Sequence, residues 1–125
     1  MPSLRTGSGT ARVGIAMSVR WYILQRASAA LMVPMVLLHL AVIFYASGHA
    51  ISAGAILART RGSLDWGMFY ATFVLAASVH AAIGLYGILG EWTPMRGRGR
   101  DVTIGTFFLV LVALGLRAVA AVTLP

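Results

Sequence analysis

Residues 21–47 read WYILQRASAALMVPMVLLHLAVIFYAS, and Arg26 is the single formally charged side chain among them. A helix needs roughly 20 predominantly apolar residues to cross the hydrocarbon core of a bilayer. This stretch therefore predicts a membrane-spanning helix. Pro34 is expected to kink that helix, because proline lacks the N–H of one backbone hydrogen bond.

Two further stretches have the same character. Residues 66–92 carry a formal charge only at Glu91, and residues 102–123 only at Arg117. Backbone groups in hydrocarbon must be hydrogen-bonded within their own segment, so these stretches also predict helices. The sequence thus predicts an all-α membrane protein with three transmembrane helices in residues 21–125. Residues 1–20 are expected to form a flexible cytoplasmic segment, and Gly48 to open a loop.

The composition of the whole chain agrees with this prediction. The 125 residues are 59% hydrophobic and 10% charged, whereas a soluble globular chain carries about 25% charged residues. A chain of this length cannot bury that much apolar surface in its own interior, which excludes a soluble monomer. The absence of cysteine excludes disulfides, thiolate nucleophiles and iron–sulfur ligands on this chain.

The charges predict the orientation of the spans. Ten arginines and three acidic residues give a net charge of +7, and their placement beside apolar runs points to a membrane rather than to nucleic acid. Seven arginines lie near the start of the first span or between the second and third: Arg5, Arg12, Arg20, Arg26, Arg96, Arg98 and Arg100. Only Arg59 and Arg61 lie between the first and second spans. The positive-inside rule therefore predicts a cytoplasmic N-terminus and an outer C-terminus.

A histidine near the middle of the second span is the first candidate for function, because ionisable groups inside a membrane are costly. His80, Gly84, Gly87 and Glu91 are spaced by four, three and four residues and share one helix face. Two interpretations remain open. Either the small residues allow close packing while His80 hydrogen-bonds a neighbouring helix, or His80 is an axial ligand of haem iron beside glycines that admit a flat macrocycle.

One face of the first span carries polar and sulfur-containing side chains at intervals of three or four residues: Gln25, Ser28, Met32, Met35 and His39. Counted along the helix, His39 is expected at a depth similar to that of His80. It could be a second ligand, a partner of a haem propionate or a packed polar group. The last interpretation is favoured.

Aromatic and charged residues gather at the predicted inner ends of the first two spans: Tyr22, Arg26, Glu91 and Trp92. They either anchor the helices at the membrane interface or form a site for an amphipathic, lipid-soluble ligand. Arg117 in the third span either extends to the outer surface or neutralises an anionic group of a cofactor.

Two short motifs occur at corresponding places in the first two spans. Residues 21–31 read WYILQRASAAL, with Pro34 after them, and residues 80–84 read HAAIG, with Glu91-Trp92 closing that span. They resemble the QR-x-[ST]-[AG] and H-x-x-x-G … D-Y motifs in the membrane-anchor subunits of succinate dehydrogenase (succinate:quinone oxidoreductase). The resemblance covers residues 20 to 124.

That family contains a cytochrome b subunit and a smaller hydrophobic subunit. The cytochrome b subunit has Ser and His before the motif arginine, where this chain has Tyr22 and Gln25, and Arg-His after the motif glycine, where this chain has Tyr86-Gly87. The resemblance is therefore closer to the smaller subunit. That subunit usually ends its second helix with Asp-Tyr. The Trp92 indole at the Tyr position is also a hydrogen-bond donor.

The resemblance implies a place in a multi-subunit helical bundle of the bacterial inner membrane, with a periplasmic C-terminus. The implied partners are a second anchor subunit, an iron–sulfur subunit, a flavoprotein subunit and membrane lipid. Haem b is implied, with His80 as an axial iron ligand and four residues in its vicinity: Arg26, Ser28, Gly84 and His39. Ubiquinone is implied at the cytoplasmic edge, against Trp92, Glu91, Arg26 and Tyr22. The succinate and flavin sites belong to other subunits.

Two other functions remain open on the sequence alone. The chain could be a cytochrome b-type anchor of another respiratory dehydrogenase, with His39 and His80 binding haem within one chain. It could also be a haem-free assembly or packing protein in which His80 only joins helices.

Overall fold

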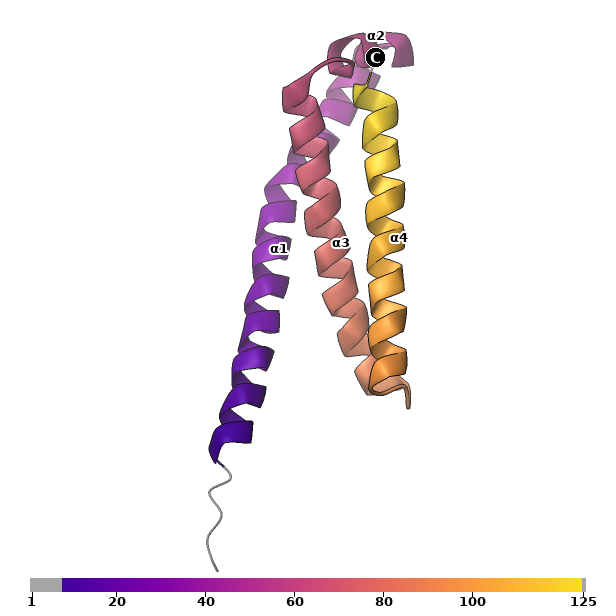
Figure 1. The fold of residues 1–125 in the computed structure, drawn as a ribbon. Coiled ribbons are helices and arrows are strands. Elements are labelled where there is room, and N and C mark those ends of the chain that lie inside the picture. The colour runs from indigo at the N-terminus through magenta and orange to yellow at the C-terminus, as the bar shows by residue number, and fades with distance from the viewer. Residues whose placement is uncertain (1–7, 125) are drawn as a thin grey trace, which may run out of the picture.

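The computed structural model describes residues 8–124, with side chains from residue 19 onward. This part of the chain contains four helices and no strand: α1 (Ser8–Gly48), α2 (Ala53–Thr60), α3 (Leu64–Trp92) and α4 (Arg98–Thr123) (Figure 1). Three helical stretches are long and apolar enough to cross a membrane, namely Val19–Gly48, Leu64–Trp92 and Arg98–Thr123. The predicted all-α membrane fold with three spans is confirmed.

The helix boundaries differ from the predicted ones. Helix α1 begins at Ser8 and continues through Pro34, and α4 begins at Arg98, before the predicted residue 102. Helix α2 lies where a loop was predicted. Its start is stabilised by Ser52, whose side chain accepts a hydrogen bond from the Ala55 N–H at 3.2 Å. Residues 1–7 of the predicted N-terminal segment lie outside the described residues.

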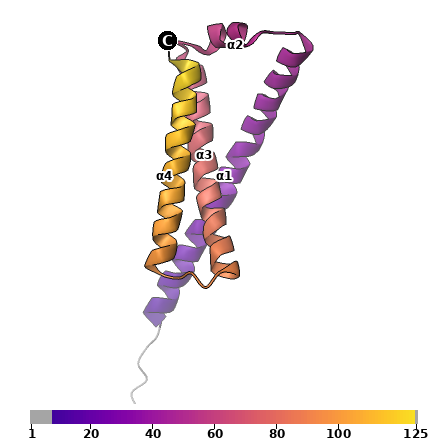
Figure 2. The ribbon, with the colours of Figure 1, turned by 90° about the vertical axis from the view of Figure 1, so that its right-hand side faces the viewer.

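Helix α3 is the centre of the arrangement, because it packs against both α1 and α4. Helices α3 and α4 run antiparallel beside each other, whereas α1 crosses them obliquely (Figures 1 and 2). Toward the end where α2 lies, α1 diverges from α3, and α2 spans the gap (Figure 2). The crossing of α1 over α3 is thus the place where side chains of these two helices meet.

Most of the buried residues in the described helices are small. The buried apolar residues are Met35, Ala76 and Ala82, and the buried polar ones are Ser28, Thr60, Ser78 and Thr123. Large apolar side chains point outward instead, as Phe44 does with 73% of its surface exposed. Small residues let helix backbones approach closely, and outward-facing apolar side chains suit lipid or neighbouring helices.

The end of the bundle where α2 lies is held by hydrogen bonds to the last turn of α4. Thr60 Oγ1 donates to the Val122 carbonyl at 2.8 Å, and the Gly62 N–H donates to the Thr123 carbonyl at 2.8 Å. These bonds satisfy carbonyls that the end of a helix leaves without partners. They place α2 beside the C-terminal end of α4, opposite the α3–α4 turn (Figure 1).

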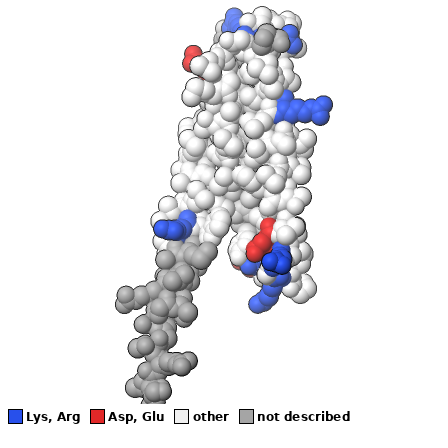
Figure 3. Space-filling view, in the orientation of Figure 1, with Lys and Arg blue, Asp and Glu red and all other residues white. Residues whose placement is uncertain are grey.

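Most charged side chains lie near one of the two ends of the bundle, the end with α2 or the end with the α3–α4 turn. Figure 3 shows most arginine and acidic side chains near the two ends of the helices, one basic side chain projecting sideways nearer the α2 end, and an uncharged belt between them. The α3–α4 turn, which contains Arg96, lies at the same end as the start of α1 (Figure 1). The arrangement of the helices is therefore compatible with insertion across a bilayer.

Candidate functional site

His80 lies half-buried on α3 where α1 crosses that helix. Its Nδ1 atom is 3.3 Å from Ser28 Oγ and 3.4 Å from the backbone carbonyl oxygen of Gln25, both on α1. Ser28 Oγ also donates a hydrogen bond to the Gln25 carbonyl at 2.9 Å. The predicted polar face of α1 and the predicted histidine face of α3 therefore meet at these three residues.

His80 also lines a groove of about 390 Å³. Apolar residues of α1 line the rest of this groove: Ala29, Met32, Val33, Val36 and Leu37. Val33 and Leu37 are 59% and 61% exposed, so the groove is open to the surroundings. One edge of the imidazole is thus fixed to α1, while the ring borders an apolar space.

The two glycines beside His80 have different surroundings. A Cβ atom at Gly84 would lie 3.5 Å from Gln25 Nε2, whereas a Cβ atom at Gly87 would meet nothing within 4 Å. The Gln25 amide of α1 thus occupies the space beside Gly84, where a larger residue would place its Cβ atom. The oxygen of that amide, Gln25 Oε1, is buried without a hydrogen-bond partner.

His39 does not lie at the depth of His80, and this prediction was wrong. His39 contacts Tyr70 edge-to-face, with ring centroids 6.2 Å apart. Tyr70 precedes His80 by ten residues, which is about 15 Å along an α-helix. His39 therefore lies at the level of Tyr70 along the bundle, and not at the level of His80. Two ligands of one iron must lie directly on either side of it, so His39 and His80 are too far apart for one haem.

The residues predicted at the quinone end lie on the outside of the described chain. Trp92 is 82% exposed and Tyr22 is 61% exposed, and the side chains of Glu91 and Arg26 are exposed as well. The Arg26 guanidinium lies 5.6 Å from the centre of the Tyr22 ring. Glu91 and Trp92 end α3, while Tyr22 and Arg26 belong to α1. Arg26 lies between Gln25 and Ser28, which contact His80, and His80 precedes Trp92 by twelve residues, or about 18 Å along α3. The prediction that Arg26 and Trp92 meet at one end was therefore wrong.

A cluster of aromatic and basic residues at the same end was not singled out from the sequence. The rings of Trp21 and Tyr86 lie nearly parallel, with centroids 6.4 Å apart and an angle of 14° between their planes. Arg100 of α4 donates a hydrogen bond to the Tyr86 hydroxyl, and its guanidinium lies 3.9 Å from the centre of that ring. The membrane-interface preference of tryptophan and tyrosine was the available sequence signal.

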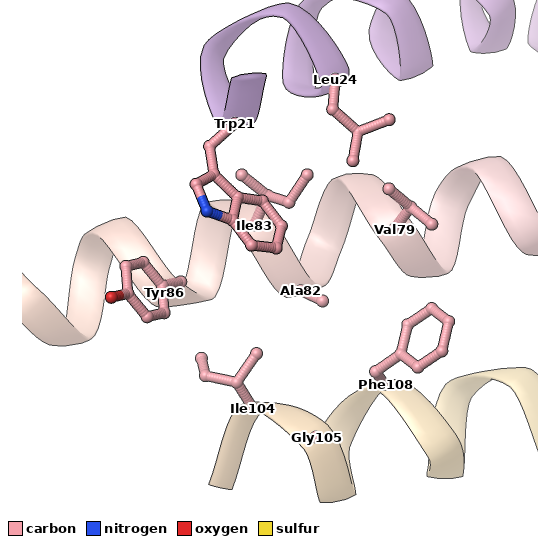
Figure 4. Close-up of a pocket in the computed structure, with 9 residues that line it drawn as sticks. All are labelled: Trp21, Leu24, Val79, Ala82, Ile83, Tyr86, Ile104, Gly105 and Phe108. Carbon is pink, nitrogen blue, oxygen red and sulfur yellow. The ribbon is translucent and has the colours of Figure 1, made fainter. Parts of the chain in front are cut away.

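Trp21 and Tyr86 also close one end of an apolar cavity of about 310 Å³ (Figure 4). All three long helices contribute to its wall, with Leu24 from α1, Val79, Ala82 and Ile83 from α3, and Ile104, Gly105 and Phe108 from α4. This cavity and the His80 groove share no lining residue, so the two are distinct.

Within residues 8–124, no group of three or more His, Cys, Asp and Glu side chains could hold a metal ion. His80 therefore belongs to no such group in the described part of the chain. A single imidazole suits axial coordination of an iron that a porphyrin already holds. Arg117 of α4 is exposed.

Comparison with known proteins bears on this arrangement. The family model described as succinate dehydrogenase/fumarate reductase transmembrane subunit matches residues 4–120. The chain belongs to this family. No curated protein and no solved structure gave a significant match. The resemblance based on the two motifs is therefore confirmed for the family as a whole.

Membership of this family makes the chain a membrane subunit of a succinate dehydrogenase/fumarate reductase complex. Such a subunit works together with other subunits, which agrees with the large apolar side chains that α1 leaves exposed, such as Phe44 and Leu37. Three candidate spans and this family also make it a multi-pass membrane protein.

Proposed function

We propose that this chain is the smaller hydrophobic anchor of a succinate:quinone oxidoreductase. In this role it helps to bind haem b and ubiquinone and docks the iron–sulfur and flavoprotein subunits. The family match supports the role of a membrane subunit. Tyr22, Gln25 and the Tyr86-Gly87 pair depart from the pattern of the cytochrome b subunit, which supports the smaller anchor.

The position of His80 carries the haem part of this proposal. One edge of its imidazole is engaged by Ser28 and the Gln25 carbonyl, and the ring borders the apolar groove. Gly87 leaves open space on the same face of α3. These surroundings fit an axial ligand. Haem b, when bound, supplies a one-electron carrier inside the membrane.

The second axial ligand comes from the partner anchor. Within the described residues, His39 lies too far from His80, and His49 stacks on Tyr45 beyond the end of α1, with ring centroids 4.2 Å apart. The groove beside His80 is also open. A haem shared between two anchor subunits would supply both the missing ligand and the missing wall.

We place the quinone end at the cytoplasmic end of α3, where the exposed Trp92 indole can donate a hydrogen bond to a quinone carbonyl. Arg26 lies between Gln25 and Ser28, which contact His80, and its guanidinium suits an anion at that level, such as a haem propionate. Because these side chains are exposed, the partner subunits complete the pocket. Glu91 immediately precedes Trp92 in the sequence. The Tyr22 ring lies beside the Arg26 guanidinium.

The Trp92→Phe variant of the complex is expected to reduce quinone more slowly, by tenfold at most. It loses one neutral hydrogen bond, which contributes about 0.5–1.5 kcal/mol. The rate of succinate-dependent quinone reduction measures this effect, and reduction of a soluble acceptor by the flavoprotein stays unchanged. Trp66→Phe makes the same replacement at the other end of α3 and serves as the control. Equal rates in all three proteins would make Trp92 a membrane anchor only.

The proposed orientation places the start of α1 and the α3–α4 turn in the cytoplasm, supported by seven arginines near that end. A reporter active only in the periplasm is expected to be active when fused after Pro125 and inactive when inserted at Gly97. The opposite pattern would put the quinone end on the wrong side of the membrane for docking the soluble subunits.

Isolation of the tagged chain tests the function as a whole. We expect it to copurify from the membrane with a flavoprotein, an iron–sulfur protein and a second anchor, identified by mass spectrometry. The isolated complex is expected to transfer electrons from succinate to a quinone. A chain that purifies with a different dehydrogenase, or with none, would contradict the proposal.

A further inference from the structure

We propose that Ser28 is a positioning residue for His80. Together with the Gln25 carbonyl, it holds the proton of the neutral imidazole on Nδ1 and leaves Nε2 as the only nitrogen able to bind a metal. The value of this tautomer for haem binding rests on the proposed function. The tautomer itself follows from contacts within this chain alone.

The Gln25 carbonyl gives the first reason. Its oxygen lies 3.4 Å from His80 Nδ1, and a carbonyl oxygen can only accept hydrogen bonds. A bare Nδ1 lone pair facing this oxygen would be repelled. A neutral imidazole carries its single proton on one nitrogen, so this contact is favourable only when the proton is on Nδ1.

The Ser28 hydroxyl gives the second reason. It has one hydrogen, which it donates to the Gln25 carbonyl at 2.9 Å. The hydroxyl oxygen therefore faces His80 Nδ1, 3.3 Å away, with its lone pairs. Ser28 then acts as a second acceptor for the same Nδ1–H. One assignment of hydrogens satisfies all three contacts.

Burial makes this arrangement selective. Ser28 is 5% exposed and lies at the crossing of α1 and α3, where water has little access to compete for the Nδ1–H. Hydrogen bonds are stronger in such an environment, and an unpaired polar group there is costly. Metal-bound histidines commonly donate their other N–H to a carbonyl or another acceptor, which fixes both tautomer and ring orientation.

Nitrogen NMR of the full chain in lipid nanodiscs, with ¹⁵N-labelled histidine and no haem, tests the tautomer directly. The His80 signals are identified by their loss in His80→Asn. We expect a protonated Nδ1 and an unprotonated Nε2 at neutral pH. The Ser28→Ala variant is expected to show a mixture of tautomers, because one of the two acceptors is gone. Ser28→Thr keeps the hydroxyl and should restore the original spectrum.

Ser78→Ala is the matched control, because Ser78 is a second buried serine, 3% exposed, on α3 itself. Its removal should leave the His80 signals unchanged. A wild-type His80 with the proton on Nε2 would overturn the proposal without any variant. A Ser28→Ala spectrum identical to the wild type would overturn the role of Ser28, because the Gln25 carbonyl would then suffice.

Haem affinity of the isolated complex is a separate readout. Loss of a residue that orients a metal ligand typically lowers affinity by 10- to 100-fold, so we expect a loss of about tenfold or more in Ser28→Ala and none in Ser28→Thr. A complex without haem would contradict the proposed function, yet the expected tautomer in the free chain would still support the positioning role. The two proposals therefore fail separately.

Discussion

Replacing His80 with alanine is expected to abolish the b-type haem spectrum of the isolated complex. Among the described residues that line the groove between α1 and α3, His80 alone carries a side-chain nitrogen, and alanine offers the iron no ligand. Absorption spectroscopy of the complex purified from the membrane, in the Soret region, measures the effect. The three spans should still insert, because their hydropathy does not depend on this residue.

The His39→Ala variant is the matched control for this experiment. It removes an imidazole from the same membrane domain, but one that contacts Tyr70, which precedes His80 by ten residues, or about 15 Å along α3. The haem spectrum should survive that change. If the His80→Ala complex keeps its full haem spectrum, His80 only joins α3 to α1 through Ser28. The protein would then be a packing subunit whose partners hold the haem.

Replacing Gly115 with alanine is expected to destabilise the contact between α3 and α4 by about 1–3 kcal/mol, the usual cost of overpacking a tight interface. The added methyl group would lie 2.9 Å from Val74 Cγ2 and still closer to Val74 Cγ1. Valine is branched at Cβ and has little rotameric freedom in a helix, so the clash must separate the helices. Unfolding of the reconstituted chain by denaturing detergent, followed by circular dichroism, measures the loss.

Two companion variants make this prediction specific. Gly105→Ala places the same substitution on the same helix, where the new methyl group meets nothing within 4 Å, so stability should not fall. Combining Gly115→Ala with Val74→Ala removes the clashing methyl groups and should recover part of the lost stability. A Gly115→Ala protein as stable as the wild type would mean that α3 and α4 tolerate a wider separation.

Much of the fold could be predicted because hydropathy acts on each span separately. A bilayer requires an uninterrupted apolar helix, and the three stretches that meet this requirement are visible in the sequence without any knowledge of their contacts. Helix α2 was missed for the same reason. It has only eight residues, and its position depends on hydrogen bonds from Thr60 and Gly62 to the end of α4.

In the candidate site, too, features of a single helix could be predicted, whereas contacts between helices could not. Residue spacing placed Ser28 on one face of the first span and His80 on one face of the second, and these faces meet. Spacing could not predict the depth of His39, because depth depends on how two helices are aligned and how they cross. It also gave no sign that Arg100 packs on Tyr86, a contact between different helices.

The sequence by itself determined three membrane spans, the residues that share each helix face and the concentration of arginine near one end. These properties come from local periodicity and from the cost of placing charge in hydrocarbon. The tertiary structure decided which faces meet: Ser28 and the Gln25 carbonyl against His80, Gly115 against Val74, and His39 against Tyr70. Two helices form such contacts only where small residues let their backbones approach closely. The places of close approach are a property of the pair of helices and cannot be read from either sequence segment alone.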